Sequence, residues 1–197
     1  MIRVCASALL LAMTAPAQQA VRSAEFARLE GQVYVDDQRA EAHAAVPDKS
    51  VVRTADGRAE IRVRSGALFL GENSAIRIFE NQSYNFNRME MIRGSALIQT
   101  AANIGLVVCE DTVSLSDSGI FRLDLQRISQ SPYGENDCRF RVFRGAASVQ
   151  LPSFAVPLRA GETMGLNRRC GDMIPTEEFK LSVEDDLLKW AGVARPR

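Results

Sequence analysis

Histidine is nearly absent from this chain, and its scarcity limits the catalysis that the chain can perform. His43 is the sole histidine among 197 residues, so any Ser-His-Asp or Cys-His arrangement would have to use it. It lies in an alanine-rich connection with weak structural signals. The motifs Gly-x-Ser-x-Gly and Cys-x-x-Cys are also missing from the sequence. We therefore interpret His43 as solvated or structural, and we expect no enzymatic activity.

The chain also has no excess of positively or negatively charged side chains. Lysine plus arginine and aspartate plus glutamate each number 24, and no basic stripe is dense enough to predict nucleic-acid binding. Three acidic clusters lack the spaced oxygen ligands of a calcium loop, and each is interpreted as a turn or a helix start: Asp36-Asp37, Glu110-Asp111 and Glu184-Asp185-Asp186. No glycine-rich phosphate loop or dinucleotide fingerprint is found. We expect neither a metal nor a cofactor.

No apolar run is long enough to span a bilayer. Such a helix needs about 20 apolar residues, and the run from Val4 to Met13 is about half that length. A short basic start precedes it, and Ala15-Pro16-Ala17 has the small-x-small form that signal peptidase recognises. We predict a signal peptide over residues 1–17, cleaved after Ala17. Because Cys5 lies inside the run, a lipid anchor is not expected, and the protein is predicted to be soluble and bacterial, periplasmic or otherwise exported.

Cysteine is scarce, and its pairing is left open by the sequence. Removal of the signal peptide takes away Cys5 and leaves Cys109, Cys138 and Cys170. An odd number in an oxidising compartment implies one bridge and one thiol, or no bridge. Spacing alone cannot choose the pair. We favour Cys138 with Cys170, because both adjoin polar loops, whereas Cys109 follows the apolar run 106–108.

The stretch from Val51 to Ile78 carries the strongest structural signal, because its turns and its apolar pattern agree. Asp56-Gly57 is a strong hairpin turn sequence, and Ser65-Gly66 is a weaker one. These turns would place Thr54 opposite Ala59 and Ile61 opposite Leu70. Side chains of a strand alternate between its two faces, so one face is predicted to be buried. Its members are Val52, Thr54, Ala59, Ile61, Val63, Leu68 and Leu70.

Further alternating segments joined by glycine turns predict an all-β fold. We expect hairpins that turn near Gly94 within residues 88–100, before Gly119, at Gly145 and at Gly161. Residues 88–100 are apolar on both faces and are expected to be covered on both sides. Pro157 marks an edge strand. The antiparallel hairpins and meanders are predicted to stack as a sandwich or a solenoid-like domain over residues 29–180.

The two ends of the mature chain differ from this domain. Residues 18–28 are expected to be a flexible lead-in, and the first strand is predicted over 27–35. Residues 181–197 are predicted to be a short helix and a tail. Leu187 and Trp190 fall at helical spacing there, and Ser182 with Asp185 and Asp186 suits a helix start. Trp190, the only tryptophan, is predicted to anchor this helix against the sheet.

Several of these features follow one another along the chain in an order that can be compared with known families. They are Gly31-x-Val33, Arg53-Thr54 before Asp56-Gly57, Gly66, Ser74 before Ile76, Arg93-Gly94 and Gly119. This order resembles the FecR domain over roughly residues 29–166, most specifically over 51–98. The chain departs from that pattern at Ser65-Gly66, where the family usually has Asp-Gly, and at Gly119-Ile120, where it has Gly-Thr. The resemblance implies a non-catalytic all-β module outside the cytoplasm. FecR itself relays a signal from an outer-membrane transporter to a sigma factor through a cytoplasmic segment and a membrane helix. With only three residues before its apolar run, this chain is expected to be a stand-alone extracytoplasmic domain.

The sequence favours a non-enzymatic binding or sensing module of the bacterial cell envelope. Such a module would meet an envelope protein or a glycan through a loop or a sheet edge, and exposed arginines are expected at positions 62, 64, 139 and 141. A structural envelope protein is an alternative that the sequence does not separate from this one. A glycan-directed enzyme would need a pair of loop carboxylates about 5–10 Å apart.

Overall fold

The computed structural model describes residues 24–80, 87–108, 111–127, 136–151, 153–166, 177–178 and 185–192. These residues form sixteen strands and one short helix, α1 (Asp186–Trp190), which confirms the predicted all-β class. The signal peptide, Cys109 and Cys170 lie outside the described residues. Cys138 is buried, and its pairing with Cys170 stays a prediction. Within the described residues, no helix is long and apolar enough to cross a membrane.

The strands form two sheets that share one long strand, β8 (Asn87–Thr100). The first sheet contains, in spatial order, β1 (Ala24–Glu30), β5 (Arg58–Val63), β6 (Gly66–Leu70), the second half of β8, β11 (Ile120–Arg127), β12 (Asn136–Arg144), β15 (Glu162–Gly165) and β16 (Glu177–Glu178). All of its neighbouring strands are antiparallel.

The second sheet faces the first. It contains, in spatial order, β3 (Gln38–Arg39), β2 (Val33–Val35), β4 (Val51–Thr54), β7 (Ala75–Glu80), the first half of β8, β9 (Ile104–Val108), β10 (Asp111–Leu115), β13 (Ala146–Gln150) and β14 (Ala155–Arg159). The pair β8–β9 is parallel. As Pro157 predicts, β14 is the last strand of its sheet, pairing with β13 alone among the described strands.

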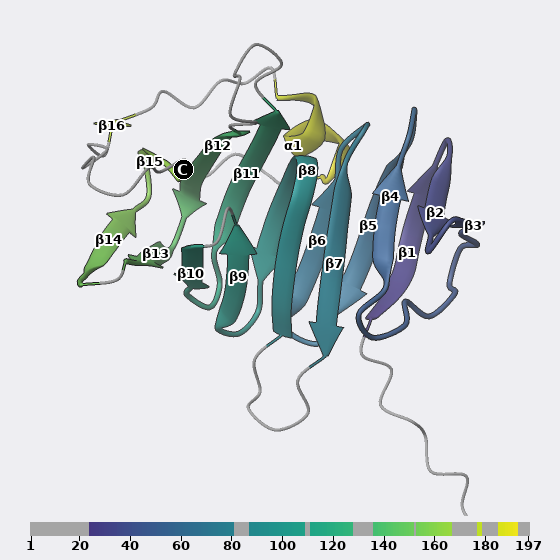
Figure 1. The fold of residues 1–197 in the computed structure, drawn as a ribbon, viewed down its shortest axis with the longest axis horizontal. Helices are drawn as coiled ribbons and strands as arrows, with labels where there is room; N and C mark the ends of the chain where they lie inside the picture. Colours follow the sequence, from purple (N-terminus) through teal and green to yellow (C-terminus); the bar gives the residue numbers. More distant parts are fainter. Residues whose placement is uncertain are drawn as a thin grey trace, which may run out of the picture.

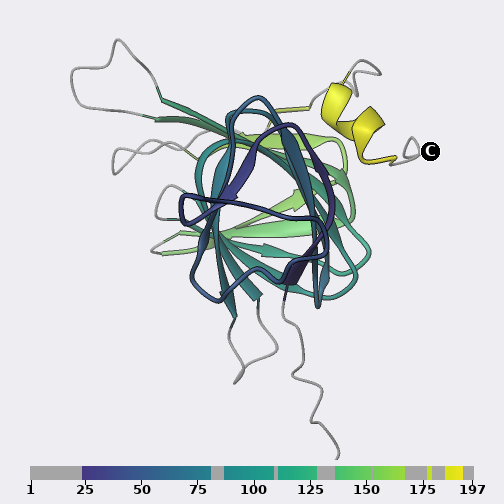
Figure 2. The ribbon, with the colours of Figure 1, turned by 90° about the vertical axis from the view of Figure 1, so that its right-hand side faces the viewer.

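The chain crosses between the sheets again and again as it advances along the molecule. Figure 1 shows this advance from β1, β2 and β3 at one end to β13–β16 at the other. Seen along that axis, the strands enclose a core and α1 lies outside them (Figure 2). The arrangement combines the two predicted alternatives, because its facing sheets form a sandwich and its progressive crossings resemble a solenoid.

The predicted hairpin at Asp56-Gly57 is wrong. β4 pairs with β2 and β7 in the second sheet, whereas β5 pairs with β1 and β6 in the first, so Thr54 is not opposite Ala59. Residues 55–57 carry the chain across the core instead of reversing it within one sheet. The buried set was nevertheless predicted correctly, because strands that face each other across a core have the same apolar alternation as strands in a hairpin.

The second predicted hairpin exists with a different register. β5 and β6 pair through Ile61 and Leu68, and the turn residues are Arg64 and Ser65 rather than Ser65 and Gly66. The partner of Ile61 therefore moves by two residues from the expected Leu70. A shift of two keeps every side chain on its face, which is why the predicted buried residues are still buried.

The hairpin predicted around Gly94 is a single strand. β8 pairs with β7 up to Arg93 and with β6 and β11 from Gly94 onward, so this glycine marks a crossing and not a reversal. Gly94 has a φ of 87°. A Cβ atom there would lie 2.5 Å from Ser74 Cα, closer than real Cβ contacts come. Only glycine fits a position that combines this backbone conformation with so close an approach.

The predicted turns at Gly119, Gly145 and Gly161 are also crossings. The turn before Gly119 joins β10 of the second sheet to β11 of the first. The turn at Gly145 joins β12 of the first sheet to β13 of the second, and the turn at Gly161 joins β14 of the second sheet to β15 of the first. Val142 therefore does not pair with Ala147, as a hairpin at Gly145 would require. At the crossing around Gly161, Glu162 Oε2 accepts from the Arg159 backbone N–H at 2.7 Å.

Buried hydroxyl groups hold neighbouring crossings together. Thr54 Oγ1 donates to Gly71 O at 2.6 Å and accepts from the Ser74 N–H at 2.9 Å. Ser74 Oγ donates to Ser95 O at 3.0 Å and accepts from the Ser95 N–H at 2.9 Å. Thr100 Oγ1 donates to Ser116 O at 2.6 Å and accepts from the Gly119 N–H at 2.8 Å. Each hydroxyl thus binds backbone groups of a neighbouring crossing.

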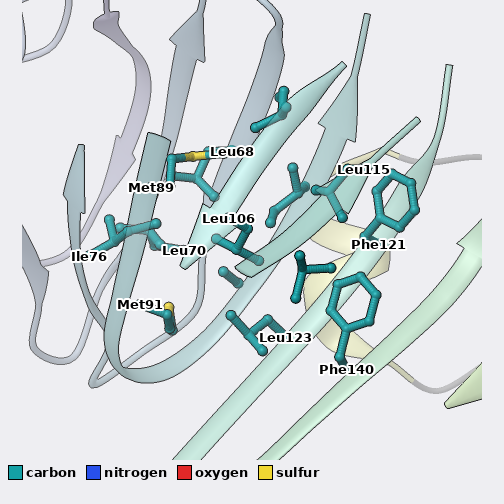
Figure 3. Packing of buried hydrophobic residues seen from close by; sticks show 14 of the residues in the cluster. Leu68, Leu70, Ile76, Met89, Met91, Leu106, Leu115, Phe121, Leu123 and Phe140 are labelled. Atoms are coloured by element: carbon teal, nitrogen blue, oxygen red, sulfur yellow. The ribbon is translucent and has the colours of Figure 1, made fainter. Parts of the chain in front are cut away.

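The core between the sheets is apolar and continuous. Both sheets contribute to it, with Leu68 and Leu70 from the first facing Ile76 and Met89 from the second (Figure 3). Phe121 and Phe140 stack with their ring centroids 6.0 Å apart. Phe26 is fully buried in β1, so residues 24–28 belong to the sheet and not to the expected flexible lead-in. The first strand therefore starts earlier than predicted and ends at Glu30.

Replacing Gly94 and Gly161 by alanine distinguishes the cost of a close approach between chain segments from the cost of a left-handed backbone conformation. We expect Gly94→Ala to lower the free energy of unfolding by at least about 2 kcal/mol more than Gly161→Ala. Gly161 has a similar φ of 90°, but a Cβ atom there would meet nothing within 4 Å, so its replacement costs strain alone. Urea denaturation of both variants measures the difference. Equal losses would show that the crossing at Gly94 has room for a side chain.

Candidate functional site

The outer face of the first sheet carries a row of side chains that runs across neighbouring strands. Arg28 is paired with Glu60, Phe69 with Leu97, and Arg122 with Arg141 in the strand registers. The registers Glu60–Phe69 and Leu97–Arg122 join these pairs into one line. Alternation points this line away from the core, because its strand neighbours, such as Leu68 and Leu123, are buried inside. The face therefore has an apolar centre with charged residues on both sides.

The apolar centre consists of Phe69, Leu97, Ile120 and Phe143, and α1 covers it. Leu187 of α1 is buried against these residues, and Trp190 contacts Phe69 edge to face, with ring centroids 6.2 Å apart. This confirms the prediction that Trp190 anchors the helix. It also confirms the predicted cover on both faces of the second half of β8, where Leu97 is fully buried.

Two residues of β1, Arg28 and Glu30, also contact Trp190. The guanidinium carbon of Arg28 lies 3.9 Å from the centroid of the indole, a distance at which the cation is attracted to the ring. Arg28 also donates to the Trp190 carbonyl, and the indole N–H donates to Glu30. Trp190 is thus fixed by an apolar contact, a cation and two hydrogen bonds.

Asp185 is the N-cap of α1, and Ser182, which was also expected near the helix start, lies outside the described residues. Asp185 Oδ1 accepts from the backbone N–H groups of Leu187 and Leu188 at 3.0 and 3.1 Å, which is the geometry of an N-cap. Its other oxygen, Oδ2, accepts from Arg122 Nη1. One carboxylate therefore starts the helix and ties it to the sheet.

Arg122 is the centre of the charged cluster beside α1. Its Nε donates to both oxygens of Asp124, at 3.0 and 3.1 Å, and its Nη2 donates to Oδ1 at 2.9 Å. Arg141 Nη1 donates to Asp124 Oδ2 at 2.7 Å. Burial favours the neutral guanidine and acts to lower the pKa of Arg122, but hydrogen bonds and charges from Asp124 and Asp185 outweigh it, so the pKa is raised. Arg122 is a permanent cation at this site.

A groove of about 490 Å³ opens beside the N-terminus of α1. Its lining combines both charges, because it includes Arg58 and Arg122 together with Glu72, Asp185 and Asp186. Glu72 is within 3.4 Å of Arg58, and Asp185 is bound to Arg122. These carboxylates are thus engaged by guanidinium groups, an arrangement suited to holding charged or polar groups.

Three of the four arginines singled out from the sequence lie on this outer face. Arg62 and Arg139 are exposed, whereas Arg141 is half-buried against Asp124, so its expected exposure is wrong. Arg64 is exposed in the β5–β6 turn. Sequence reasoning missed Arg122, because an Arg-x-Asp alternation also occurs on ordinary solvated strands. The available signal was the apolar residues on both faces of 88–100, which require a cover over this part of the sheet.

His43 lies in the connection between β3 and β4. His43 is exposed, with a φ of 63°, and its N–H donates to Phe26 O at 2.9 Å. A depression of about 420 Å³ nearby is lined by Phe26, Arg39 and Ala44 among others, and His43 is not in its lining. Within the described ranges, no group of three or more His, Cys, Asp or Glu side chains is placed to hold a metal ion.

Comparison with known proteins finds a similar fold and no family. No protein-family model and no curated protein matches the chain. Two crystal structures of a "putative anti-sigma factor" from Parabacteroides distasonis share the fold over 72% of this chain, with TM-scores of 0.52 and 0.53 and identities of 14% and 13%. The match spans 62% of each of those chains. At this identity the likeness is one of fold alone, and membership of the FecR family stays a prediction.

Removal of the Arg122 charge tests whether the cluster stabilises the protein. We expect Arg122→Met to lower the free energy of unfolding by about 2 kcal/mol, because it leaves Asp124 and Asp185 close together without their shared cation. Urea denaturation measures the loss. The matched control, Arg62→Met, removes a cation whose side chain is 65% exposed and should cost less than about 0.5 kcal/mol. Similar effects for both variants would make Arg122 an ordinary surface residue.

Proposed function

We propose that this protein is an exported, non-enzymatic binding or sensing module of the bacterial cell envelope, related to the FecR domain. The observation that carries the proposal is the outer face of the first sheet, where an apolar centre under α1 lies between charged residues and a groove opens beside the N-terminus of α1. Export rests on the predicted signal peptide over residues 1–17. The mature chain would start at Gln18 and present this face to an envelope partner.

Two independent likenesses support a regulatory role. The order of Arg53-Thr54, Ser74 and Gly94 resembles the FecR domain, which acts in signalling to a sigma factor. The similar crystal structures carry the name "putative anti-sigma factor". We infer that the chain belongs on the extracytoplasmic side of such a signalling route, where a module without a catalytic centre acts by contact.

The proposed lack of enzymatic activity rests on the state of the carboxylates. A glycosidase pair needs one carboxyl group free to donate a proton and another free to attack or to activate water. In the groove, Asp185 is bound to Arg122 and caps α1, and Glu72 lies beside Arg58. These contacts favour recognition over acid–base catalysis. A purely structural role in the envelope remains the second hypothesis.

Affinity capture from envelope extract tests the proposal. The mature chain, immobilised and crosslinked, should recover an envelope component, and the double variant Arg62→Ser/Arg139→Ser should recover at least about tenfold less, because it removes cations that border the proposed contact surface. The matched control Arg88→Ser/Arg93→Ser removes two exposed cations from the second sheet and should bind like the wild type.

Two results would count against the proposal. Recovery of no component above a bead control would remove the binding role and leave the structural one. Equal losses for both double variants would show that binding depends on net charge and not on the outer face of the first sheet. Mass spectrometry of the periplasmic protein provides the test of export, since the chain should begin at Gln18. A chain that keeps Met1 in the membrane fraction would contradict it.

A further inference from the structure

The helix α1 depends on the sheet for its existence. It has five residues, and isolated helices of that length are not stable in water, because nucleation costs more than so few hydrogen bonds return. Its contacts are Leu187 and Trp190 on the apolar centre and Asp185 on Arg122. α1 is therefore a bound segment whose conformation the sheet imposes, in the manner of a peptide ligand.

The sheet, in contrast, positions its side of the contact through its own strand pairing and ion pairs. Phe69, Leu97 and Ile120 are fixed by the strand registers of β6, β8 and β11. Asp124 takes the Nε and Nη2 groups of Arg122, and this pair lies within β11 alone. Arg122 Nη1 is thereby directed outward, where it meets the carboxylate of Asp185. The face is a pre-organised receptor for a carboxylate next to an apolar helix surface.

We propose that this face binds an acidic, amphipathic helical segment of a partner protein, and that α1 is an intramolecular occupant that the partner displaces. The inference rests on the proposed binding function and specifies its partner. The partner segment presents a carboxylate at its helix start to Arg122, an apolar residue two positions later to the apolar centre, and an aromatic residue three positions after that to Phe69. These are the spacings of Asp185, Leu187 and Trp190 in α1.

Charge and space around the helix favour a partner segment longer than α1. The groove of about 490 Å³ continues from the helix start and is bordered there by Arg58, so residues that precede the helix start have room and a cation to contact. At the other end of the row, Arg28 lies over the aromatic ring and donates to the carbonyl at the end of the helix. A segment with negative charge at its beginning complements this face better than a neutral one.

Trp190 gives a direct measurement of displacement in the intact protein. It is the only tryptophan, so the tryptophan emission of the mature wild-type chain reports on α1 alone. The probe is a synthetic peptide of residues 181–197 with Trp190→Phe, which contributes no tryptophan signal. We expect saturable movement of the emission to longer wavelength as the peptide takes the place of α1 and Trp190 enters water. A peptide that also carries Asp185→Asn and Leu187→Asp is the matched control and should cause no change.

A weakened α1 should yield to the peptide more easily. Linked segments compete at effective concentrations near the millimolar range, so displacement from the wild type requires high peptide concentration. Leu187→Asp in the mature chain should lower the peptide concentration at half-displacement at least about tenfold. Adding Arg122→Gln to this variant should raise that concentration again. Circular dichroism confirms that the β fold is intact. An unchanged emission spectrum in both proteins at saturating peptide would overturn the proposal, and the wild-type titration alone can do so if the variant does not fold.

The affinity capture described above separates this inference from the proposed function. If the native-sequence peptide, and not the control peptide, competes the captured protein off the mature chain, the inference is supported. Capture of a protein that the peptide does not compete would leave the binding role standing and overturn the helix receptor. Recovery of a glycan, or of a second copy that exchanges α1, would also overturn it, and size-exclusion chromatography of the wild type detects the second copy.

Discussion

The need to satisfy buried backbone groups where the chain crosses between sheets governs this structure. A strand ladder supplies hydrogen bonds within a sheet, but residues that pass from one sheet to the other leave it. Thr54, Ser74 and Thr100 fill this need with hydroxyl groups that each join two neighbouring crossings. Gly94 allows its crossing to approach Ser74. Thr54, Ser74, Gly94 and Gly119 belong to the order of residues that resembles the FecR domain, and all four lie at crossings or bind to them.

Sequence reasoning identified buried residues and the pairing of β5 with β6, but it gave wrong partners at most other turns. Period-two alternation gave the class and the buried members around Ile61 correctly, because the apolar face of a strand must meet the core whichever strand lies beside it. It gave the wrong neighbours at Asp56-Gly57 and at Gly145. A short turn can lead to a partner in the same sheet or to a strand on the far side of the core. The turn residues and the apolar alternation beside them do not distinguish these two outcomes. The long-range hydrogen bonds of Thr54, which settle the matter, involve residues about twenty positions away.

The candidate site could be anticipated only in outline. The helical spacing of Leu187 and Trp190 and the apolar residues on both faces of 88–100 predicted a helix on the sheet, and this is what α1 provides. Arg122 could not be found in this way, because its importance comes from a carboxylate more than sixty positions away in the chain. The hydrogen-bonded crossings lie within the sandwich, whereas the helix packs on the outer face of the first sheet. We therefore expect the helix to open separately from the sandwich.

Native-state hydrogen exchange of the mature chain tests this claim most directly. The N–H groups of Ser74, Ser95 and Gly119, which donate to hydroxyls at the crossings, should exchange only through global unfolding. The N–H groups of Lys189 in α1 and of its C-cap Ala191 should exchange through local opening at a clearly lower free energy. A single opening free energy for both sets would contradict the account, because it would make α1 an inseparable part of the fold.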